Sequence, residues 1–338
     1  MMNSMEQQKR LAQIGNIRVL AIFLVVLGHS IILYSTGWGL YETTRQAPFL
    51  AWLKSVIDIP QMPLFFSLSG YLFVFTHRKK QGIGQLAKKK FLRLVVPYLG
   101  IGLLYLLPIR LAVGYPGYKG NSVADFALKF LTANDVGHLW FLPALFLVFL
   151  LSEIILSVAE HIPVLKKAPG IVLLMAGGVL YLEGYRVGFG YGPLLSAFNY
   201  LMWFALGYCL NVYQEYVRKV YRIRIVKWGL LLVNLLLLAY ALSVSSVRVL
   251  ISLGLRTLFI INAFRAMPEK ACSLVQRIDR NSFGIYLFHS PLIYITFASI
   301  PNAHPAIVVF INLVIFGAAA FGLTELVRKT KLRVLIGE

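Results

Sequence analysis

Long apolar runs separated by short polar stretches extend along almost the whole chain. A helix needs roughly 20 apolar residues to cross a hydrocarbon core of about 30 Å. The pattern therefore predicts an all-α integral membrane protein, a bundle of about ten transmembrane helices with both termini in the cytoplasm. The expected spans are 17–35, 52–76, 92–112, 139–158, 170–182, 193–212, 226–242, 245–264, 282–300 and 306–327. No Pro-, Ser- or Gly-rich linker divides the chain, so we expect a single domain over residues 1–338.

Composition supports a membrane protein. Of the 338 residues, 59% are hydrophobic and 14% are charged, whereas soluble domains carry roughly 45–50% apolar and about 25% charged residues. The net charge is +20, from 33 Lys and Arg against 13 Asp and Glu. Most of the basic residues fall in alternate loops, which is the pattern of the positive-inside rule. The charge is thus accounted for by topology and by contact with anionic lipid, and no nucleic-acid partner is expected.

Two ionisable residues in the first span are candidates for function, because such groups are costly within a membrane. Arg18 and His29 are eleven residues apart, which is close to three full helical turns and about 16 Å along the axis. Both side chains therefore share one face of the helix. Histidine is the commonest general base near neutral pH. The alternatives are an arginine that reaches the lipid surface and a buried histidine that only joins helices.

The basic residue followed by ten positions and a histidine resembles the N-terminal signature of acyltransferase family 3, membrane proteins that acylate sugars. Further stretches are similar to the family's motifs: Q-M-P-L-F-F-S-L-S-G from Gln61, K-K-K-F-L-R-L-V-V-P-Y from Lys88, G-H-L-W-F-L-P-A-L-F from Gly137 and I-Y-L-F-H-S-P-L from Ile285. One position departs from the family, which often has histidine where this chain has Gln61. Glutamine forms hydrogen bonds but does not titrate, so no second base is expected there.

The resemblance implies an acyl-CoA donor, most commonly acetyl-CoA, that arrives from the cytoplasm, and no metal. Arg18, Lys88, Lys89, Lys90 and Arg93 would hold the phosphates of this donor by charge-assisted contacts. The alternative for the basic run is a topology signal alone.

The acceptor that the resemblance implies is a carbohydrate hydroxyl, and His29 would act as its general base or carry the acyl group. Residues expected near the acceptor are Trp38, Asp58, Gln61, Ser69, His138, Trp140 and His289. Ser67, Ser69 or His289 would stabilise an oxyanion. Their structural alternatives are an aromatic belt at the membrane interface, helix packing of the serines beside Gly70, and a histidine that satisfies backbone groups freed by Pro291.

The predicted function is a multi-pass O-acyltransferase of a plasma membrane, bacterial by its resemblance, that acylates a cell-surface polysaccharide or its lipid-linked precursor. A transporter or flippase of lipid-linked sugars is the main alternative, and it would show substrate accumulation without acyl-CoA. A receptor or scaffold is disfavoured by the short loops. Neither the acceptor sugar nor the oligomeric state follows from the sequence.

Overall fold

The computed structural model describes residues 4–35, 39–80, 82–118, 120–187, 192–223 and 248–338, together with six positions between 226 and 236. Within these ranges the protein is helical and contains no strand. The α-helices are α1 (Ser4–Ser30), α2 (Pro48–Asp58), α3 (Gln61–His77), α4 (Ile83–Lys90), α5 (Val96–Ile101), α6 (Leu107–Ala112), α7 (Val123–Thr132), α8 (Phe141–His161), α9 (Pro169–Val187), α10 (Gly192–Val212), α11 (Gln214–Arg222), α13 (Arg248–Ala266), α14 (Ser273–Ser299), α15 (Pro305–Phe310) and α16 (Phe316–Arg328).

Six helical segments among the described residues are long and apolar enough to cross a membrane. They are Gln8–Ser30, Pro48–His77, Ile83–Ala112, Gly137–His161, Gly192–Val212 and Pro305–Arg328, and they coincide with six of the ten predicted spans. The predicted span 170–182 lies in α9, which contributes a shorter apolar helix, and 245–264 and 282–300 overlap α13 and α14. Most of 226–242 lies outside the described residues. The ten-span count therefore stays a prediction.

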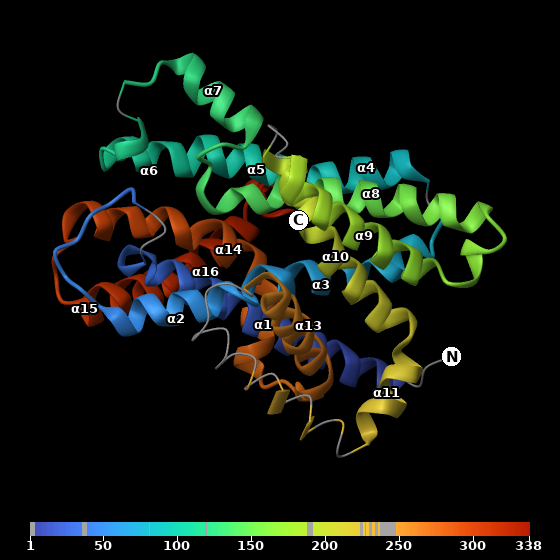
Figure 1. Cartoon of the computed structure of the whole chain (residues 1–338). Helices are drawn as coiled ribbons and strands as arrows, with labels where there is room; N and C mark the ends of the chain where they lie inside the picture. Colours follow the sequence, from blue (N-terminus) through green and yellow to red (C-terminus); the bar gives the residue numbers. More distant parts are fainter. Residues whose placement is uncertain are drawn as a thin grey trace.

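The helices form two packed groups that meet along α1 and α3 (Figure 1). In one group α14 packs between α1 and α16, and in the other α10 packs against α3, α8 and α9. The helical rod from α4 to α6 runs beside α8, and α7 lies over the far end of this rod. Both cavities described below are lined by helices of the two groups, and the rod contributes to the lining of the first.

Helices α3 and α10 approach each other closely, and two glycines make this contact possible. A Cβ atom on Gly70 would lie 1.9 Å from the carbonyl oxygen of Phe204, and one on Gly207 would lie 1.8 Å from that of Ser67. The hydroxyl of Ser67 donates to the carbonyl of Trp203 across this contact at 2.9 Å. Small residues allow membrane helices to approach in this way, and Ser67 accordingly has the packing role that was the alternative to catalysis.

Irregular turns interrupt two of the apolar rods. The segments Phe91–Val95 and Gly102–Leu106 are π-helical turns that precede and follow α5, and Ile311–Ile315 is a third between α15 and α16. Such turns add a residue to the helical repeat and change the direction of the side chains that follow. The first of them carries Arg93 and follows directly on Lys90.

Candidate active site

A cavity of about 360 Å³ opens between α1, α3, α8, α14 and the Phe91–Val95 turn. We call it the basic cavity, because Arg18, Lys90, Arg93 and Arg280 contribute to its lining. Its remaining wall is mostly apolar and aromatic, with Phe65, Phe141 and Phe149 among others. The cavity thus combines cationic groups with an apolar wall, which suits an anionic molecule that carries an extended, largely uncharged chain.

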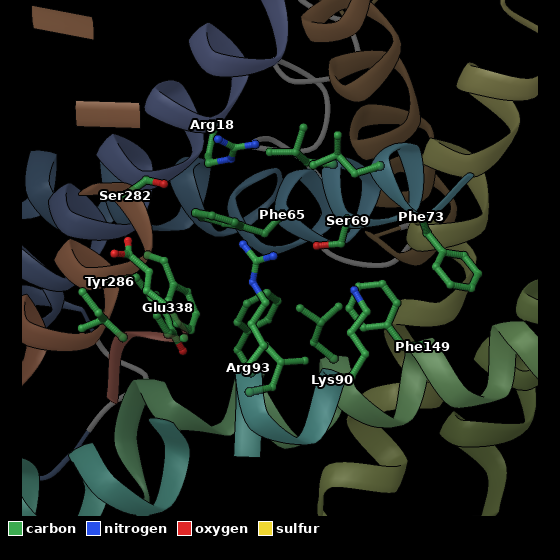
Figure 2. A pocket seen from close by; sticks show the side chains of 18 of the residues that line it. Arg18, Phe65, Ser69, Phe73, Lys90, Arg93, Phe149, Ser282, Tyr286 and Glu338 are labelled. Atoms are coloured by element: carbon green, nitrogen blue, oxygen red, sulfur yellow. The ribbon is translucent and has the colours of Figure 1, made fainter. Parts of the chain in front are cut away.

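Three of the four cations of the basic cavity, Arg18, Lys90 and Arg93, point into it from opposite sides (Figure 2). Lys90 and Arg93 extend from one helix toward α3, and Lys90 Nζ lies 3.4 Å from the centroid of the Phe149 ring. Arg18, on the opposite side, donates one nitrogen to Asp279 Oδ1 at 2.5 Å. Neither Lys90 nor Arg93 has a carboxylate partner within the described part of the chain. Positive charge therefore remains available for an anion.

The segment Ile336–Glu338 closes the basic cavity on one side. The carboxylate of Glu338 accepts two hydrogen bonds from Arg328 Nε, at 2.8 and 3.0 Å, and one from its Nη2. This hydrogen bonding lowers the pKa of Glu338 below its ordinary value. The charges of Arg280 and Arg93 also favour the ionised form of Glu338, after its main partner Arg328.

A second cavity, of about 190 Å³, lies against the C-terminal end of α1. We call it the histidine cavity, since His29 and His138 both line it. Asp58, Gln61 and Met62 form one wall, and Trp140 and Tyr200 form another, with their ring centroids 5.4 Å apart. Aromatic faces beside polar side chains are a suitable lining for a sugar, which has both apolar C–H faces and hydroxyls.

Helices α1 and α14 run parallel, and two side-chain contacts join them at different heights. Arg18 pairs with Asp279, and His29 Nδ1 lies 2.8 Å from His289 Nε2 nearer the C-terminal ends of both helices. Eleven residues separate the two partners on α1 and ten separate those on α14, so the contacts are about 15–16 Å apart at 1.5 Å per residue. The same helix pair thus places Arg18 in the basic cavity and His29 in the histidine cavity.

Hydrogen bonding fixes which nitrogen of His29 carries a proton. A backbone carbonyl only accepts, so His289 Nδ1, which lies 2.8 Å from the carbonyl of Ile285, must be the protonated nitrogen of that ring. In the neutral ring Nε2 is then an acceptor and receives the proton of His29 Nδ1. This leaves His29 Nε2 without a proton and without a partner among the described residues. A bare Nε2 is the form that a general base requires.

Pro291 determines the state of the third histidine. Proline has no N–H, so Pro291 leaves the carbonyl of Leu287 without its usual partner within α14. His138 Nε2 donates to this carbonyl at 3.1 Å. Its Nδ1 is consequently bare, and this atom is buried without a hydrogen-bond partner. The sequence hypothesis assigned the freed backbone to His289, but the structure places His138 there.

The loop before His138 is held by an arginine among tyrosines. Arg110, 1% exposed, donates to the carbonyl of Asp135 at 2.6 Å and to the hydroxyl of Tyr294 at 2.6 Å. Its guanidinium lies 4.1 Å from the centroid of the Tyr115 ring. Asp135 and Gly137 both have positive φ, of 54° and 56°, a backbone conformation that costs energy at the aspartate. Arg110 thus compensates for a strained turn that aims His138 at the cavity.

Tyr286 lines both cavities. It lies one turn before His289 on α14, and its hydroxyl donates to the backbone carbonyl of His138. The ring of Tyr286 therefore stands between the basic cavity and the histidine cavity, and its hydroxyl is engaged with the chain itself.

The structure brings most of the predicted site residues together, in two groups. Arg18, Lys90, Arg93 and Ser69 line the basic cavity, whereas the neighbouring Lys88 and Lys89 do not. Asp58, Gln61, His138 and Trp140 line the histidine cavity with His29, and His289 supports His29 from behind. Trp38 lies outside the described residues.

Several residues of the two cavities were missed from the sequence. Tyr286 lies within the stretch Ile285–Leu292 and one helical turn from His289, so helical spacing alone could have indicated it. Asp279 precedes His289 by ten residues, close to the eleven that separate Arg18 from His29. The significance of this spacing is clear only once α1 and α14 are known to be parallel. No local signal marks Tyr200 or the segment Ile336–Glu338.

Comparison with known proteins identifies the family. No curated protein and no solved structure matches the chain. The model of acyltransferase family 3, described as an acyltransferase domain, matches residues 11–325 and so contains nearly every residue of both cavities. The chain is therefore a multi-pass membrane protein that belongs to acyltransferase family 3.

Proposed function

We propose that this protein transfers an acetyl group from cytoplasmic acetyl-CoA to a hydroxyl of a cell-surface polysaccharide or its lipid-linked precursor. Ten membrane spans with both termini in the cytoplasm, in a bacterial plasma membrane, complete the proposal. The observation that carries it is the bare Nε2 of His29, which lines one cavity while the same helix carries Arg18 into another.

The donor would bind in the basic cavity. Its phosphates would contact Lys90, Arg93 and the nitrogens of Arg18 that Asp279 does not use. The pantetheine arm would follow the apolar wall toward Phe141 and Tyr286. The rise from Arg18 to His29 is about 16 Å, and this is the distance over which the arm would carry the thioester.

The acceptor hydroxyl would enter the histidine cavity beside His29. As its oxygen attacks the thioester carbonyl, His29 Nε2 takes the hydroxyl proton. The C–S bond then breaks, and the leaving thiolate takes that proton from His29, so that ester, free CoA and neutral imidazole remain. Throughout, the Nδ1 proton stays on its hydrogen bond to His289, which keeps the ring in the required tautomer.

The test is acetyl transfer by the membrane-embedded protein. The purified protein is reconstituted in vesicles, which receive radiolabelled acetyl-CoA. Membranes from cells that lack the gene supply the glycan, and the label incorporated into this glycan is measured. His29→Ala should reduce the rate roughly 100- to 10,000-fold, the usual contribution of a general base. Its thermal unfolding should stay close to wild type, because the side chain borders a cavity and has a single hydrogen-bond partner, His289.

The matched control is His161→Ala, which removes an exposed histidine that bonds only to the carbonyl of Ser157. This variant should transfer acetyl at the wild-type rate. Undiminished transfer by His29→Ala, or the absence of any acetyl-CoA consumption by the wild-type protein, would contradict the proposed function.

A further inference from the structure

We propose that His138 selects the acceptor: its Nδ1 accepts a hydrogen bond from a second hydroxyl, so the substrate is a sugar that carries two adjacent free hydroxyls. One hydroxyl would give its proton to His29 and receive the acyl group, and its neighbour would donate to His138. The inference rests on the proposed function and adds to it the class of acceptor and a residue that determines specificity.

The first observation is an acceptor atom without a donor. His138 is 5% exposed, and its Nδ1 has no hydrogen-bond partner. Buried polar atoms are nearly always paired, and an unpaired one is destabilising. The proton position is not open to choice, because Nε2 must donate to the carbonyl of Leu287. His138 therefore presents a lone pair beside the histidine cavity that only a hydrogen-bond donor satisfies.

The second observation is the arrangement of the two rings that carry the bare nitrogens. The rings of His29 and His138 have centroids 6.3 Å apart and stand edge to face at 74°. A hydrogen bond to either ring places a hydroxyl oxygen about 2.7–2.9 Å from its nitrogen. Both oxygens would lie in one cavity of about 190 Å³, beside two neighbouring rings. Hydroxyls on adjacent sugar carbons are a pair that a single sugar unit would present to both rings together.

A third unpaired hydrogen-bond acceptor, on Gln61, also favours a ligand that carries hydroxyls. Gln61 Nε2 donates to the carboxylate of Asp58 at 2.8 Å, which fixes the amide orientation because a carboxylate only accepts. Its Oε1 is left buried and unpaired. Lys54 in turn holds both oxygens of Asp58 at 2.5 Å. Three residues that line the cavity, His29, His138 and Gln61, thus have an unpaired hydrogen-bond acceptor, and this favours a ligand rich in O–H donors.

An acceptor with an isolated hydroxyl would leave His138 Nδ1 buried and unpaired in the complex. Sites built to bond a substrate hydroxyl reject analogues that lack it for this reason. We expect such an acceptor to be used roughly 10- to 100-fold less efficiently than one with adjacent hydroxyls.

Two substitutions distinguish a role of His138 in acceptor binding from a purely structural role. In His138→Gln the amide nitrogen reaches toward Leu287, but no acceptor occupies the place of Nδ1. In His138→Asn, Oδ1 takes the place of Nδ1, but the contact with Leu287 is lost. With serial dilutions of glycan-bearing membranes as acceptor, His138→Gln should raise the acceptor KM at least tenfold. His138→Asn should keep it within about threefold and lower the thermal unfolding temperature instead. The KM for acetyl-CoA should stay the same in both.

The reverse pattern, a normal acceptor KM in His138→Gln together with a raised one in His138→Asn, would show a purely structural role and overturn the inference. The product gives a second test. Wild-type product, analysed by NMR, should carry the acetyl group on a carbon whose neighbour bears a free hydroxyl. An ester on an isolated hydroxyl, such as an exocyclic CH₂OH, would also overturn it. Absence of labelled product with wild-type protein would instead refute the proposed acyl transfer.

Discussion

Lysine side chains two positions apart on α4 have different surroundings. Lys90 lines the basic cavity and packs its ammonium over Phe149, whereas Lys88 is exposed and lies outside the cavity. If the cavity holds the phosphates of the donor, these two lysines differ in function although the sequence K-K-K makes them look alike.

Lys90→Met should therefore raise the KM for acetyl-CoA roughly tenfold or more, since a hydrogen bond to a charged group contributes about 1.5–3 kcal/mol. Methionine retains the apolar stem and its contact with Phe149. Lys88→Met removes the same charge from the same helix and should leave this KM unchanged. Initial rates at several donor concentrations measure both, and equal effects of the two substitutions would argue against the cavity as the donor site.

Residue-level prediction from sequence worked within one helix and failed between helices. Helical spacing predicts that Arg18 and His29 share a face, and the two side chains line cavities that meet at Tyr286. The contact of His29 with His289 joins positions 260 residues apart in the chain. Only the packing of α1 against α14 brings them together, and no local pattern encodes that packing.

At the scale of elements, the contact between α3 and α10 depends on the absence of two Cβ atoms. Gly70→Ala would place its Cβ 1.9 Å from the Phe204 carbonyl oxygen, so the two backbones would have to separate. We expect a loss of about 1–3 kcal/mol or more and a clearly lower unfolding temperature in detergent.

Gly178→Ala on α9 is the control for this substitution, because its Cβ would meet nothing within 4 Å. Alanine is the better helix former by about 1 kcal/mol, so this variant should be neutral or stabilising. Thermal unfolding followed by intrinsic fluorescence compares the two. A Gly70→Ala protein as stable as wild type would mean that the helices are farther apart than described.

Elements with a strong apolar pattern were predicted well, and those with mixed composition were not. Six predicted spans coincide with long apolar helices, because burial in lipid requires a continuous apolar run. Helix α14 carries Asp279, Arg280, Asn281 and His289 among its apolar residues, and it begins nine residues before the predicted span 282–300. The polar residues in the first part of α14 line the basic cavity or contact α16. They lower the hydrophobicity of this part, so the sequence pattern places the start of the helix too late.

For the whole molecule, the proposed topology places the loop between α3 and α4 in the cytoplasm and the loop between α14 and α15 outside. In a chain whose Cys209 and Cys272 are replaced by alanine, a cysteine at Lys79 should react with a membrane-impermeant maleimide only after the cells are opened. A cysteine at Asn302 should react in intact cells. Labelling of position 79 from outside would contradict the arrangement of donor and acceptor sides.

Hydrophobicity alone predicts an all-helical membrane protein, but it does not predict the two cavities. The excess of basic loops predicts an orientation, but it gives Lys88, Lys89 and Lys90 equal weight. Lys90 enters the basic cavity, and Lys88 and Lys89 do not, because of the way α4 packs against α8. This is an outcome of packing between segments far apart in the chain.

The tautomer of His138 depends on a backbone hydrogen bond that α14 lacks at Pro291. The missing amide hydrogen of Pro291 leaves the Leu287 carbonyl open to His138 and thereby sets the proton on that ring. Any residue with an N–H at position 291 would repair the helix and bring an internal competitor for the same carbonyl. The helix would gain regularity, and His138 would lose the bond that fixes its tautomer. Selection for stability and selection for chemistry therefore act in opposite directions at this single position.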